Sequence, residues 1–377
     1  MDRLRGDVTG AARPWPVVNL RSDTQTLPTP EMREAMLRSK LGDDTYREDP
    51  TVFELEERAA ERLGAEAAML LLSGTMANLV ALMTHCRPSD AVFLDDRAHV
   101  LLNEAGGLSG VAGAVPTVVA SNRGHLKPSA LDQAIREPRV QQPRPRLVWL
   151  ENTHNRAGGT VLDADGVQAI VRIAQQHGLR THMDGARLFN ASTALGVAPS
   201  NLLSGVDSVY VDLTKGLCCP LGALLAGSAA FIEEARRNRQ VLGGGMRQAG
   251  VIAACGIVAL SGLVERLGED HVRARRLAGG LATINGIRVT PAIVETNIVF
   301  ADVASVGGPA RFTDRLADEG VLVSSAPPDL IRFVTHRDVD DAEIEHAIEA
   351  CRRAADALRS TATGSDTISR PGGGDEL

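Results

Sequence analysis

From about residue 65 to residue 227, short apolar runs alternate with longer stretches of helical periodicity. Two of the longer stretches, Thr75–His85 and Ala164–His177, directly follow apolar runs or the turns after them. Such alternation predicts a mostly parallel α/β sheet with helices on both faces. Seven runs are strand candidates: Ala67–Leu72, Ala91–Leu94, Ala114–Val119, Arg146–Glu151, Leu179–Asp184, Ser208–Leu213 and Leu221–Ala226.

The rest of the chain predicts a second, smaller domain. A chain of 377 residues is long for one hydrophobic core. A long helical stretch from Met246 to about Arg266 leads into a region with further helices near 270–283, 309–319 and 340–358. Strands are expected there near 287–291, 296–302, 321–324 and 330–335. The predicted division is a flexible arm (1–16), a large domain (17–265), a small α+β domain (266–359) and a disordered tail (360–377).

Composition excludes several classes of protein. A net charge of −7 without a dense basic stripe predicts no nucleic-acid partner. The first residues lack the apolar stretch of a secretion signal. The longest apolar run, Gly250–Val264, is shorter than the roughly 20 residues that span a bilayer. Five cysteines without framework spacing or a zinc pattern indicate a cytoplasmic protein with no metal site.

Candidate chemistry appears where two of the predicted strands end. The chain has only three lysines, and Lys215 follows the apolar run D-S-V-Y-V-D-L-T. Thirty-one residues earlier, Asp184 closes another such run. A lysine that forms a Schiff base with pyridoxal phosphate needs a carboxylate beside the pyridine nitrogen. Because active groups gather at the carboxyl ends of parallel strands, this ordered pair predicts a pyridoxal-phosphate site.

Other residues at predicted strand ends have ordinary alternative interpretations. Ser73-Gly74-Thr75 precedes a helix and suits an anion, although taken alone Thr75 is better interpreted as a helix N-cap. No G-x-G-x-x-G or G-x-x-x-x-G-K-[ST] pattern supports a nucleotide site. His99 and His154 suit proton transfer, although a lone histidine is more often structural. Arg187 and Arg332 suit a substrate carboxylate, and most other arginines read as surface charges.

These motifs together resemble the low-specificity L-threonine aldolase family of fold-type I pyridoxal-phosphate enzymes. The resemblance runs from about Asn19 to Val339. It rests on N-L-R-S-D-T, G-D-D-T-Y, E-D-P-T, S-G-T-M-A-N-L-V-A-L, A-H, E-A-G-G, L-E-N-T-H-N, D-G-A-R, K-G-L, G-G-G-M-R-Q and R-x-V-T-H, in that order along the chain. So many ordered motifs are specific for the family and less specific for the reaction.

The resemblance implies how the cofactor is held. Lys215 would carry pyridoxal phosphate, and Asp184 would pair with the pyridine nitrogen. Gly74 and Thr75 would bind the phosphate, helped by Arg247 across or near a subunit interface. Family members are homotetramers built from dimers, so the same assembly is expected.

The resemblance also implies how the substrate is held. Ser22, Arg187 and Arg332 would bind the carboxylate of an amino acid, with Arg187 also beside the cofactor. His99 would stack on the cofactor ring and, with His154, lie near the β-hydroxyl. The implied reaction is cleavage of L-threonine, L-allo-threonine or a bulkier relative such as a phenylserine to glycine and an aldehyde.

Three positions depart from the family pattern, and other reactions stay open. Arg47 replaces a usual glycine, Cys218-Cys219-Pro220 replaces a small glycine-containing stretch, and Gln240 replaces a frequent lysine. A vicinal disulfide is not expected in a reducing compartment, and a small cysteine is the preferred interpretation. The alternatives are a β-eliminating lyase, a racemase or an aminotransferase, because the pocket and not the fold chooses the reaction. A binding protein that has lost catalysis is the alternative from another class.

Overall fold

The computed structural model describes residues 17–137, 139–326 and 328–364. Its centre is a seven-stranded sheet with the order β2-β10-β9-β8-β7-β3-β4. The strands are β2 (Ala67–Leu71), β3 (Asp90–Leu94), β4 (Val115–Val118), β7 (Arg144–Glu151), β8 (Arg180–Gly185), β9 (Ser208–Asp212) and β10 (Ala223–Gly227). All neighbours are parallel except those of β10, which runs antiparallel to both β2 and β9.

All seven strands predicted from the sequence are present, and the sheet is mostly parallel as predicted. The reversal of β10 follows from a short connection, because only ten residues separate β9 from β10 and leave no room for a crossover helix. Every residue of β3, β9 and β10 is buried, as expected for strands covered on both faces.

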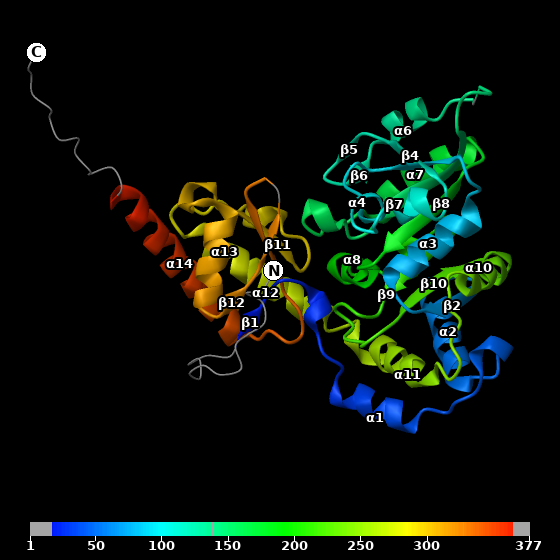
Figure 1. The fold of residues 1–377 in the computed structure, drawn as a ribbon, viewed down its shortest axis with the longest axis horizontal. Coiled ribbons are helices and arrows are strands. Elements are labelled where there is room, and N and C mark those ends of the chain that lie inside the picture. Colours follow the sequence, from blue (N-terminus) through cyan, green and yellow to red (C-terminus); the bar gives the residue numbers. More distant parts are fainter. Residues whose placement is uncertain (1–16, 138, 327, 365–377) are drawn as a thin grey trace, which may run out of the picture.

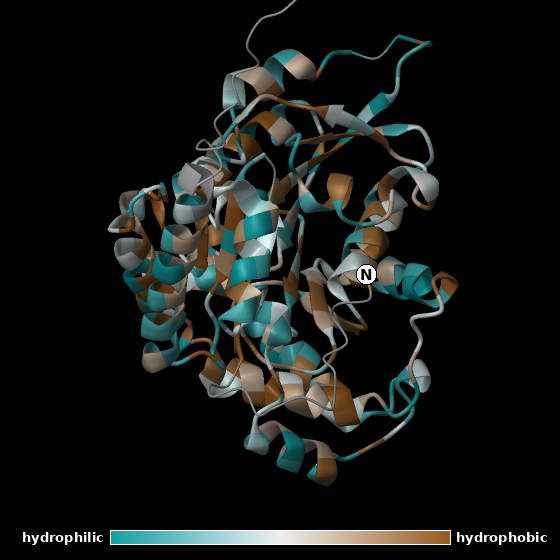
Figure 2. Ribbon diagram, turned by 60° about the vertical axis from the view of Figure 1, so that its left-hand side comes forward, coloured by the Kyte–Doolittle hydropathy of each residue, from teal (hydrophilic) through white to brown (hydrophobic). Residues whose placement is uncertain are grey.

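Alternate residues of the central strands enter different apolar clusters on the two faces of the sheet. In β2, Leu70 lies in the cluster that also contains residues of α2 (Pro50–Leu63), α7 (Ala164–Gln176), α8 (Leu188–Leu195) and α11 (Gly250–Val258). Met69 and Leu71 pack on the opposite face with α3 (Gly74–His85) and α10 (Ala229–Val241). Figure 2 shows the apolar colour on the central strands and polar colour on outer helical surfaces. The helices therefore cover both faces, as the sequence predicted.

A second, smaller body contains most of the C-terminal part of the chain (Figure 1). Its antiparallel sheet has the order β11-β14-β13. Its elements are α12 (Leu267–Ala282), β11 (Ile298–Asp302), α13 (Gly308–Asp318), β12 (Val321–Leu322), β13 (Ser324–Ala326), β14 (Leu330–Val334) and α14 (Asp341–Gly364). The expected strand near 287–291 is absent, and only the isolated bridge Arg288–Asp302 occurs there. The expected strand near 321–324 is interrupted and forms parts of β12 and β13.

The first described strand joins this smaller body. β1 (Val18–Asn19) pairs in parallel with β12, and Val18 and Leu20 lie in the C-terminal apolar cluster. The sequence had placed residue 17 onward in the large domain. The expected arm (1–16) lies outside the described residues, as does most of the expected tail, although α14 continues to Gly364.

The stretch from Met246 to Arg266 is not one straight helix as the periodicity suggested. After α11, residues Ala259–Leu263 form a π-helical turn, and α12 begins at Leu267. In the described chain no single helix is both long and apolar enough to span a membrane. One pair meets those criteria jointly, Gly250–Leu263 with Leu267–Ala282, and it is bent by 67°.

The remaining helices and strands are short and pack on the large body. Helix α1 (Pro30–Arg38) begins with the usual sequence signals, because Thr29 caps it and Pro30 occupies its first turn. The other short elements are α4 (His99–Leu102), α5 (Gly107–Gly110), β5 (Ser121–Asn122), β6 (His125–Leu126), α6 (Pro128–Ala134) and α9 (Pro199–Leu202).

Candidate active site

A pocket of about 200 Å³ lies where the parallel strands β7, β8 and β9 reach their carboxyl ends. This position agrees with the general rule for open α/β sheets. One side is formed by the N-terminal segment and by β14 of the smaller body. The lining residues are Ser22, Thr24, His99, Asn103, Glu151, Thr153, Asn155, Asp184, Ala186, Arg187, Tyr210, Lys215 and Arg332.

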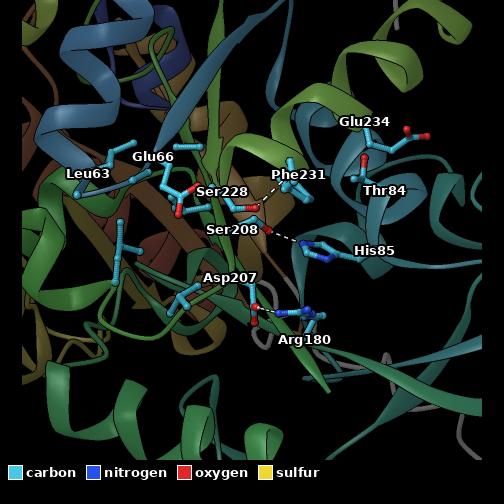
Figure 3. Close-up of a pocket in the computed structure, with 18 of the residues that line it drawn as sticks. Leu63, Glu66, Thr84, His85, Arg180, Asp207, Ser208, Ser228, Phe231 and Glu234 are labelled. Atoms are coloured by element: carbon cyan, nitrogen blue, oxygen red, sulfur yellow. Dashed lines mark hydrogen bonds and ion pairs between the residues drawn. The ribbon is translucent and has the colours of Figure 1, made fainter. Parts of the chain in front are cut away.

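A larger cavity, about 540 Å³, lies at the opposite end of the strands (Figure 3). Arg180 and Ser208, which line it, begin β8 and β9. Its polar contacts include the Arg180–Asp207 ion pair and a 2.6 Å hydrogen bond between His85 Nε2 and Ser208 Oγ. Neither the lysine nor the aspartate of the predicted pair reaches it. The smaller pocket, where those two groups converge, is therefore the candidate active site.

Asp184 is almost completely buried near the end of β8. Its Oδ2 accepts a hydrogen bond from Asn78 Nδ2 at 2.9 Å, and its Oδ1 accepts one from the Ala186 N–H at 3.1 Å. Burial raises the pKa of Asp184 to about 7, and the nearby carboxylate of Glu151 adds to the rise. A cation placed against this carboxylate would lower that pKa, which is what a protonated pyridine nitrogen does.

His99 begins α4 and joins Asp184 in a buried network. Its Nδ1 lies 2.8 Å from Glu104 Oε1, and Asn78 Nδ2 donates to that same oxygen at 2.7 Å. The His99 backbone N–H donates to Glu151 Oε2 at 2.8 Å. Burial lowers the pKa of His99, but the Glu104 hydrogen bond and the surrounding carboxylates outweigh it and raise that pKa above its ordinary value. Glu104 therefore holds the His99 ring through Nδ1, and Nε2 is the ring nitrogen that can contact a ligand.

The His99, Glu104 and Asp184 side chains offer ligand atoms within 4.8 Å of one another, which is close enough to hold a cation. The sequence predicted no metal, and that stays a prediction. Both His99 and Asp184 line the pocket, so the same oxygens and nitrogens are available to an organic cation such as a pyridinium.

The contribution of this network to the stability of the ligand-free protein falls as pH rises. Asp184, with an ordinary pKa of 3.8 and a folded pKa of about 7, binds more protons when folded, so stability falls between those values. His99, with its raised folded pKa, loses stabilisation in the same direction. Between pH 5 and pH 8 we therefore expect the Asp184 contribution to the unfolding free energy to fall by up to about 3 kcal/mol, since about two pH units of its raised range lie above pH 5. Urea denaturation measures this as the difference in pH dependence between the unchanged protein and Asp184→Asn, which lacks the titrating group, whereas exposed Asp318→Asn should keep the pH dependence of the unchanged protein. Equal slopes in both variants would contradict the expectation.

Lys215 follows β9 and points into the pocket. Its Nζ forms an ion pair with Asp212, the last residue of β9. Its backbone oxygen accepts a hydrogen bond from Thr26 Oγ1 at 2.8 Å, which ties the lysine loop to the N-terminal segment. The Lys215 side chain is 17% exposed and lines the pocket.

Arg187 lies in the pocket wall but is already paired. Its Nε and Nη2 each donate to Asp23 at 2.7 Å, and its Nη1 donates to Asn155 Oδ1 at 3.3 Å. Burial opposes the charge of Asp23, but Arg187 outweighs it and holds the pKa of that carboxyl well below its usual range. Asp23 already accepts hydrogen bonds from Nε and Nη2 of Arg187, so it would compete with a substrate carboxylate for the guanidinium group.

Arg332 has fewer hydrogen bonds than Arg187. From β14 its Nη1 donates to Asn155 Oδ1 and its Nη2 to the Arg21 carbonyl, both at 3.1 Å. Its buried Nε has no hydrogen-bond partner in the described chain. Burial, with Arg187 nearby, lowers the pKa of Arg332 to about 10. A bound carboxylate would supply both the missing partner and the missing charge.

Ser22 and Arg332 both line the pocket, and their predicted role in holding a substrate carboxylate stays a prediction. Its Oγ accepts hydrogen bonds from the Thr24 N–H at 3.2 Å and from Thr24 Oγ1 at 2.9 Å. Ser22 and Thr24 belong to the segment after β1, so that segment contributes two hydroxyl groups to the pocket that Arg187 and Arg332 also line.

His154 does not line the pocket, although it was predicted beside the substrate. It is fully buried, with Nε2 at 3.0 Å from Asp95 Oδ1 and 3.9 Å from Glu151 Oε2. Gly124, at φ 85°, lies against the ring so closely that no Cβ would fit there. Burial lowers the pKa of His154, but Glu151 and Asp95 outweigh it and raise that pKa above its ordinary value. Glu151 does line the pocket, so it connects this histidine to the site.

The predicted phosphate end lies at the start of α3. The helix is capped by Ser73, whose Oγ accepts from the Met76 N–H at 3.2 Å, so the alternative of Thr75 as the N-cap is wrong. Gly74 has no room for a side chain, because a Cβ there would lie 2.5 Å from the Tyr210 hydroxyl. Tyr210 lines the pocket, whereas Gly74 and Thr75 do not.

Arg247 lies outside the pocket lining. Its side chain is 63% exposed, and its Nη1 is 3.5 Å from Asp43 Oδ2. Within one chain, therefore, it contacts an acidic loop and no residue of the predicted phosphate end. This agrees with the expectation that its partner lies across a subunit interface, which stays a prediction.

The departures from the family pattern are accommodated away from the pocket. Arg47 has φ 57° and places its guanidinium 4.7 Å from the centre of the Phe53 ring. Cys218 has φ 62°, a left-handed conformation that glycine adopts more readily. Cys218 and Cys219 are buried free thiols in this structure. Gln240 packs against Gly245 in the glycine-rich loop.

Sequence reasoning missed several residues of this site. Asn78, Glu104 and Glu151 stood inside quoted motifs without a role, and Asp23 follows the predicted Ser22 directly. Asp212 carried a usable signal, because it is an acidic residue near the end of the same predicted strand, three positions before Lys215. The pairings themselves carried no local signal.

Comparison with known proteins agrees with this geometry. The sequence profile described as beta-eliminating lyase matches residues 19–305. Low-specificity L-threonine aldolase 1 of Arabidopsis thaliana is 42% identical over 344 residues, which cover 89% of this chain and 96% of that protein. Alanine racemase TOXG of Cochliobolus carbonum is 35% identical over 347 residues, covering 88% and 86%. The solved threonine aldolase of Leishmania major has a TM-score of 0.76 at 21% identity and covers 91% of this chain and 99% of its own.

The sheet, the strand-end pocket and these likenesses define a pyridoxal-phosphate-dependent lyase of fold-type I. The chain belongs to the beta-eliminating lyase family and, within it, to the low-specificity L-threonine aldolases.

The residues present fit pyridoxal phosphate. Asp184 is a buried carboxylate with a raised pKa that a ring cation would lower, and the Lys215 amine lies in the same pocket. The start of α3 is tightly packed at Gly74 and offers unpaired backbone N–H groups of the kind that bind phosphate. The unpartnered Arg332 Nε supplies a place for a substrate carboxylate.

Proposed function

We propose that this protein cleaves the Cα–Cβ bond of β-hydroxy-α-amino acids, with L-threonine and L-allo-threonine as the reference substrates, and releases glycine and an aldehyde. One observation carries the proposal. Asp184 and Lys215, from neighbouring strands, converge on a single pocket that also contains His99 and Arg332. This combination provides an electron sink, a covalent anchor, a proton-transferring group and a carboxylate clamp.

The proposed substrate contacts orient the bond to be broken. When bound, pyridoxal phosphate supplies a ring that accepts the electron pair of that bond. Arg332 holds the amino-acid carboxylate, and Ser22 donates to it from the adjacent segment. Asp184 keeps a positive charge on the ring nitrogen, because its buried carboxylate is stabilised by such a partner.

The proposed proton transfer uses His99 at the β-hydroxyl. Glu104 engages Nδ1 of this ring at 2.8 Å, so Nε2 is the nitrogen left to take the hydroxyl proton. That assignment fixes the tautomer by the hydrogen bond on the opposite nitrogen. His154 acts at a distance in this scheme. It lies behind the pocket wall and influences the reaction through Glu151, which also binds the His99 backbone N–H.

A racemase is the second candidate, because the 35% identical relative from Cochliobolus carbonum bears that name. Racemisation removes the Cα proton and requires no hydroxyl on the substrate. The two reactions therefore separate cleanly by substrate: threonine tests the first and alanine the second.

The test incubates the cofactor-loaded protein with L-threonine, L-allo-threonine, L-phenylserine and L-alanine separately. Glycine and aldehyde in equal amounts from a hydroxylated substrate would establish the aldolase. D-alanine from L-alanine, with no aldehyde from any substrate, would establish the racemase instead. Neither product from a protein that binds the cofactor would refute both and leave elimination or transamination to be assayed.

The proposal extends to assembly and location. We propose a homotetramer in the cytoplasm, with no nucleic-acid or membrane partner, and Arg247 reaching the phosphate of a neighbouring subunit's cofactor. The exposed Arg247 side chain supports this, because it has an acidic neighbour but no anion-binding role within its own chain. Light scattering of the purified protein tests the assembly directly.

A further inference from the structure

Strand β9, which leads to Lys215, presents a phenol hydroxyl and a carboxylate on the same face. Tyr210 and Asp212 are two residues apart in β9, so their side chains lie on one side of the sheet. Both are buried. Asp212 Oδ1 accepts from the Thr214 N–H at 2.8 Å and from Thr214 Oγ1 at 2.7 Å. Asp212 Oδ2 faces the Lys215 amine and lies 3.5 Å from the Tyr210 hydroxyl.

These side chains connect the start of α3 with the lysine. A Cβ on Gly74 would lie 2.5 Å from the Tyr210 hydroxyl, and that hydroxyl is 3.5 Å from Asp212 Oδ2. The two distances place the carboxylate within about 6 Å of the Cβ position at Gly74, the first residue of α3. The start of a helix attracts anions through its unpaired N–H groups and its dipole. A fixed carboxylate at that range opposes a phosphate that carries the same sign of charge.

We infer that Asp212 sets the affinity for the phosphorylated cofactor, by placing a buried negative charge beside the phosphate end of the site. The inference rests on the proposed function, which places the phosphate at the start of α3. Asp212 weakens phosphate binding without touching the ring or the amino-acid substrate, so it acts as a specificity determinant. The ion pair with Lys215 neutralises part of this charge, and the remainder acts on the phosphate.

The test uses a ligand that cannot react with Lys215. Pyridoxine 5′-phosphate carries the ring and the phosphate but no aldehyde, and pyridoxine lacks the phosphate as well. Asp212→Asn keeps an oxygen for Thr214 and removes only the charge. We expect this variant to bind pyridoxine 5′-phosphate at least about tenfold more tightly than the unchanged protein in calorimetric titration. Binding of pyridoxine should be unchanged.

A matched control comes from the other end of the same strand. Asp207 directly precedes β9, is also ion-paired to a basic side chain, and lines the distant cavity of Figure 3. Asp207→Asn makes the same change in net charge about 17 Å away along the strand. It should leave both affinities unchanged. A tenfold gain in this control would show a general charge effect and would overturn the inference.

A second background separates two physical causes. Removing the Asp212 charge also frees the Lys215 ammonium, which could attract phosphate by itself. In Lys215→Ala the gain from Asp212→Asn should persist, because the carboxylate itself repels the phosphate. A gain that vanishes there, or equal affinities in the original background, overturns the inference alone. No binding of pyridoxine 5′-phosphate to any variant overturns the inference and the proposed function together.

Discussion

Replacing Lys215 with alanine is expected to lower aldehyde release by at least about 10³-fold, because no other amine lines the pocket as described. The matched control is Lys127→Ala, which removes an exposed lysine from the start of α6. The chain has only three lysines, so these variants also simplify chemical mapping. Borohydride treatment of the cofactor-loaded protein should label the peptide that contains Lys215 and no other.

Two results would contradict this expectation. Aldehyde release by Lys215→Ala at a rate near that of the unchanged protein would remove the lysine from the reaction. A borohydride label on Lys40 or Lys127 would place the covalent anchor elsewhere. Loss of activity in Lys127→Ala would point to a general effect on the fold, which circular dichroism of both variants would reveal.

The second large effect concerns stability. Asp23→Ala is expected to lower the free energy of unfolding by about 3–5 kcal/mol, because it leaves the buried guanidinium of Arg187 without its carboxylate. Urea denaturation at neutral pH measures this loss. Asp318→Ala, which removes an exposed carboxylate, should change the value by less than about 1 kcal/mol.

A double variant tests the stated cause. In Asp23→Ala with Arg187→Met, the unpaired buried charge is gone, so much of the lost stability should return. A double variant that is less stable than Asp23→Ala would show that the hydrogen bonds of Arg187, and not its charge, dominate. A loss below about 1 kcal/mol in Asp23→Ala itself would contradict the expectation.

The sheet could be predicted from the sequence because its signal is local. Seven apolar runs separated by helical periodicity are enough to give a doubly covered sheet, and its strand ends give Asp184 and Lys215. The direction of β10 was not predicted, since apolar runs look alike in parallel and antiparallel strands. The helical break after Ala259 was also missed, because the apolar periodicity continues through it.

The site was harder to predict because its pairings join distant parts of the chain. Asp23 and Arg187 are separated by 164 positions, and no local pattern announces their ion pair. His154 occupies a strand end, as an active residue should, yet the Gly124 loop covers its ring. Burial of that kind depends on how a remote loop packs. Asp212 could have been selected as an acidic residue near the end of a predicted strand, three positions before Lys215, but the sequence analysis assigned a role only to the lysine.

The pocket joins two parts of the chain with separate duties. The groups proposed to act on the cofactor belong to the large body and lie between residues 74 and 215 of the chain, apart from Arg247. Ser22 and Arg332, proposed to hold the amino acid, belong to the segment after β1 and to β14. Because the two sets of residues are separate, substitutions near Ser22 and Arg332 can change substrate preference without changing the residues proposed to hold the cofactor. Relatives named for aldol cleavage and for racemisation are the outcome that this arrangement permits.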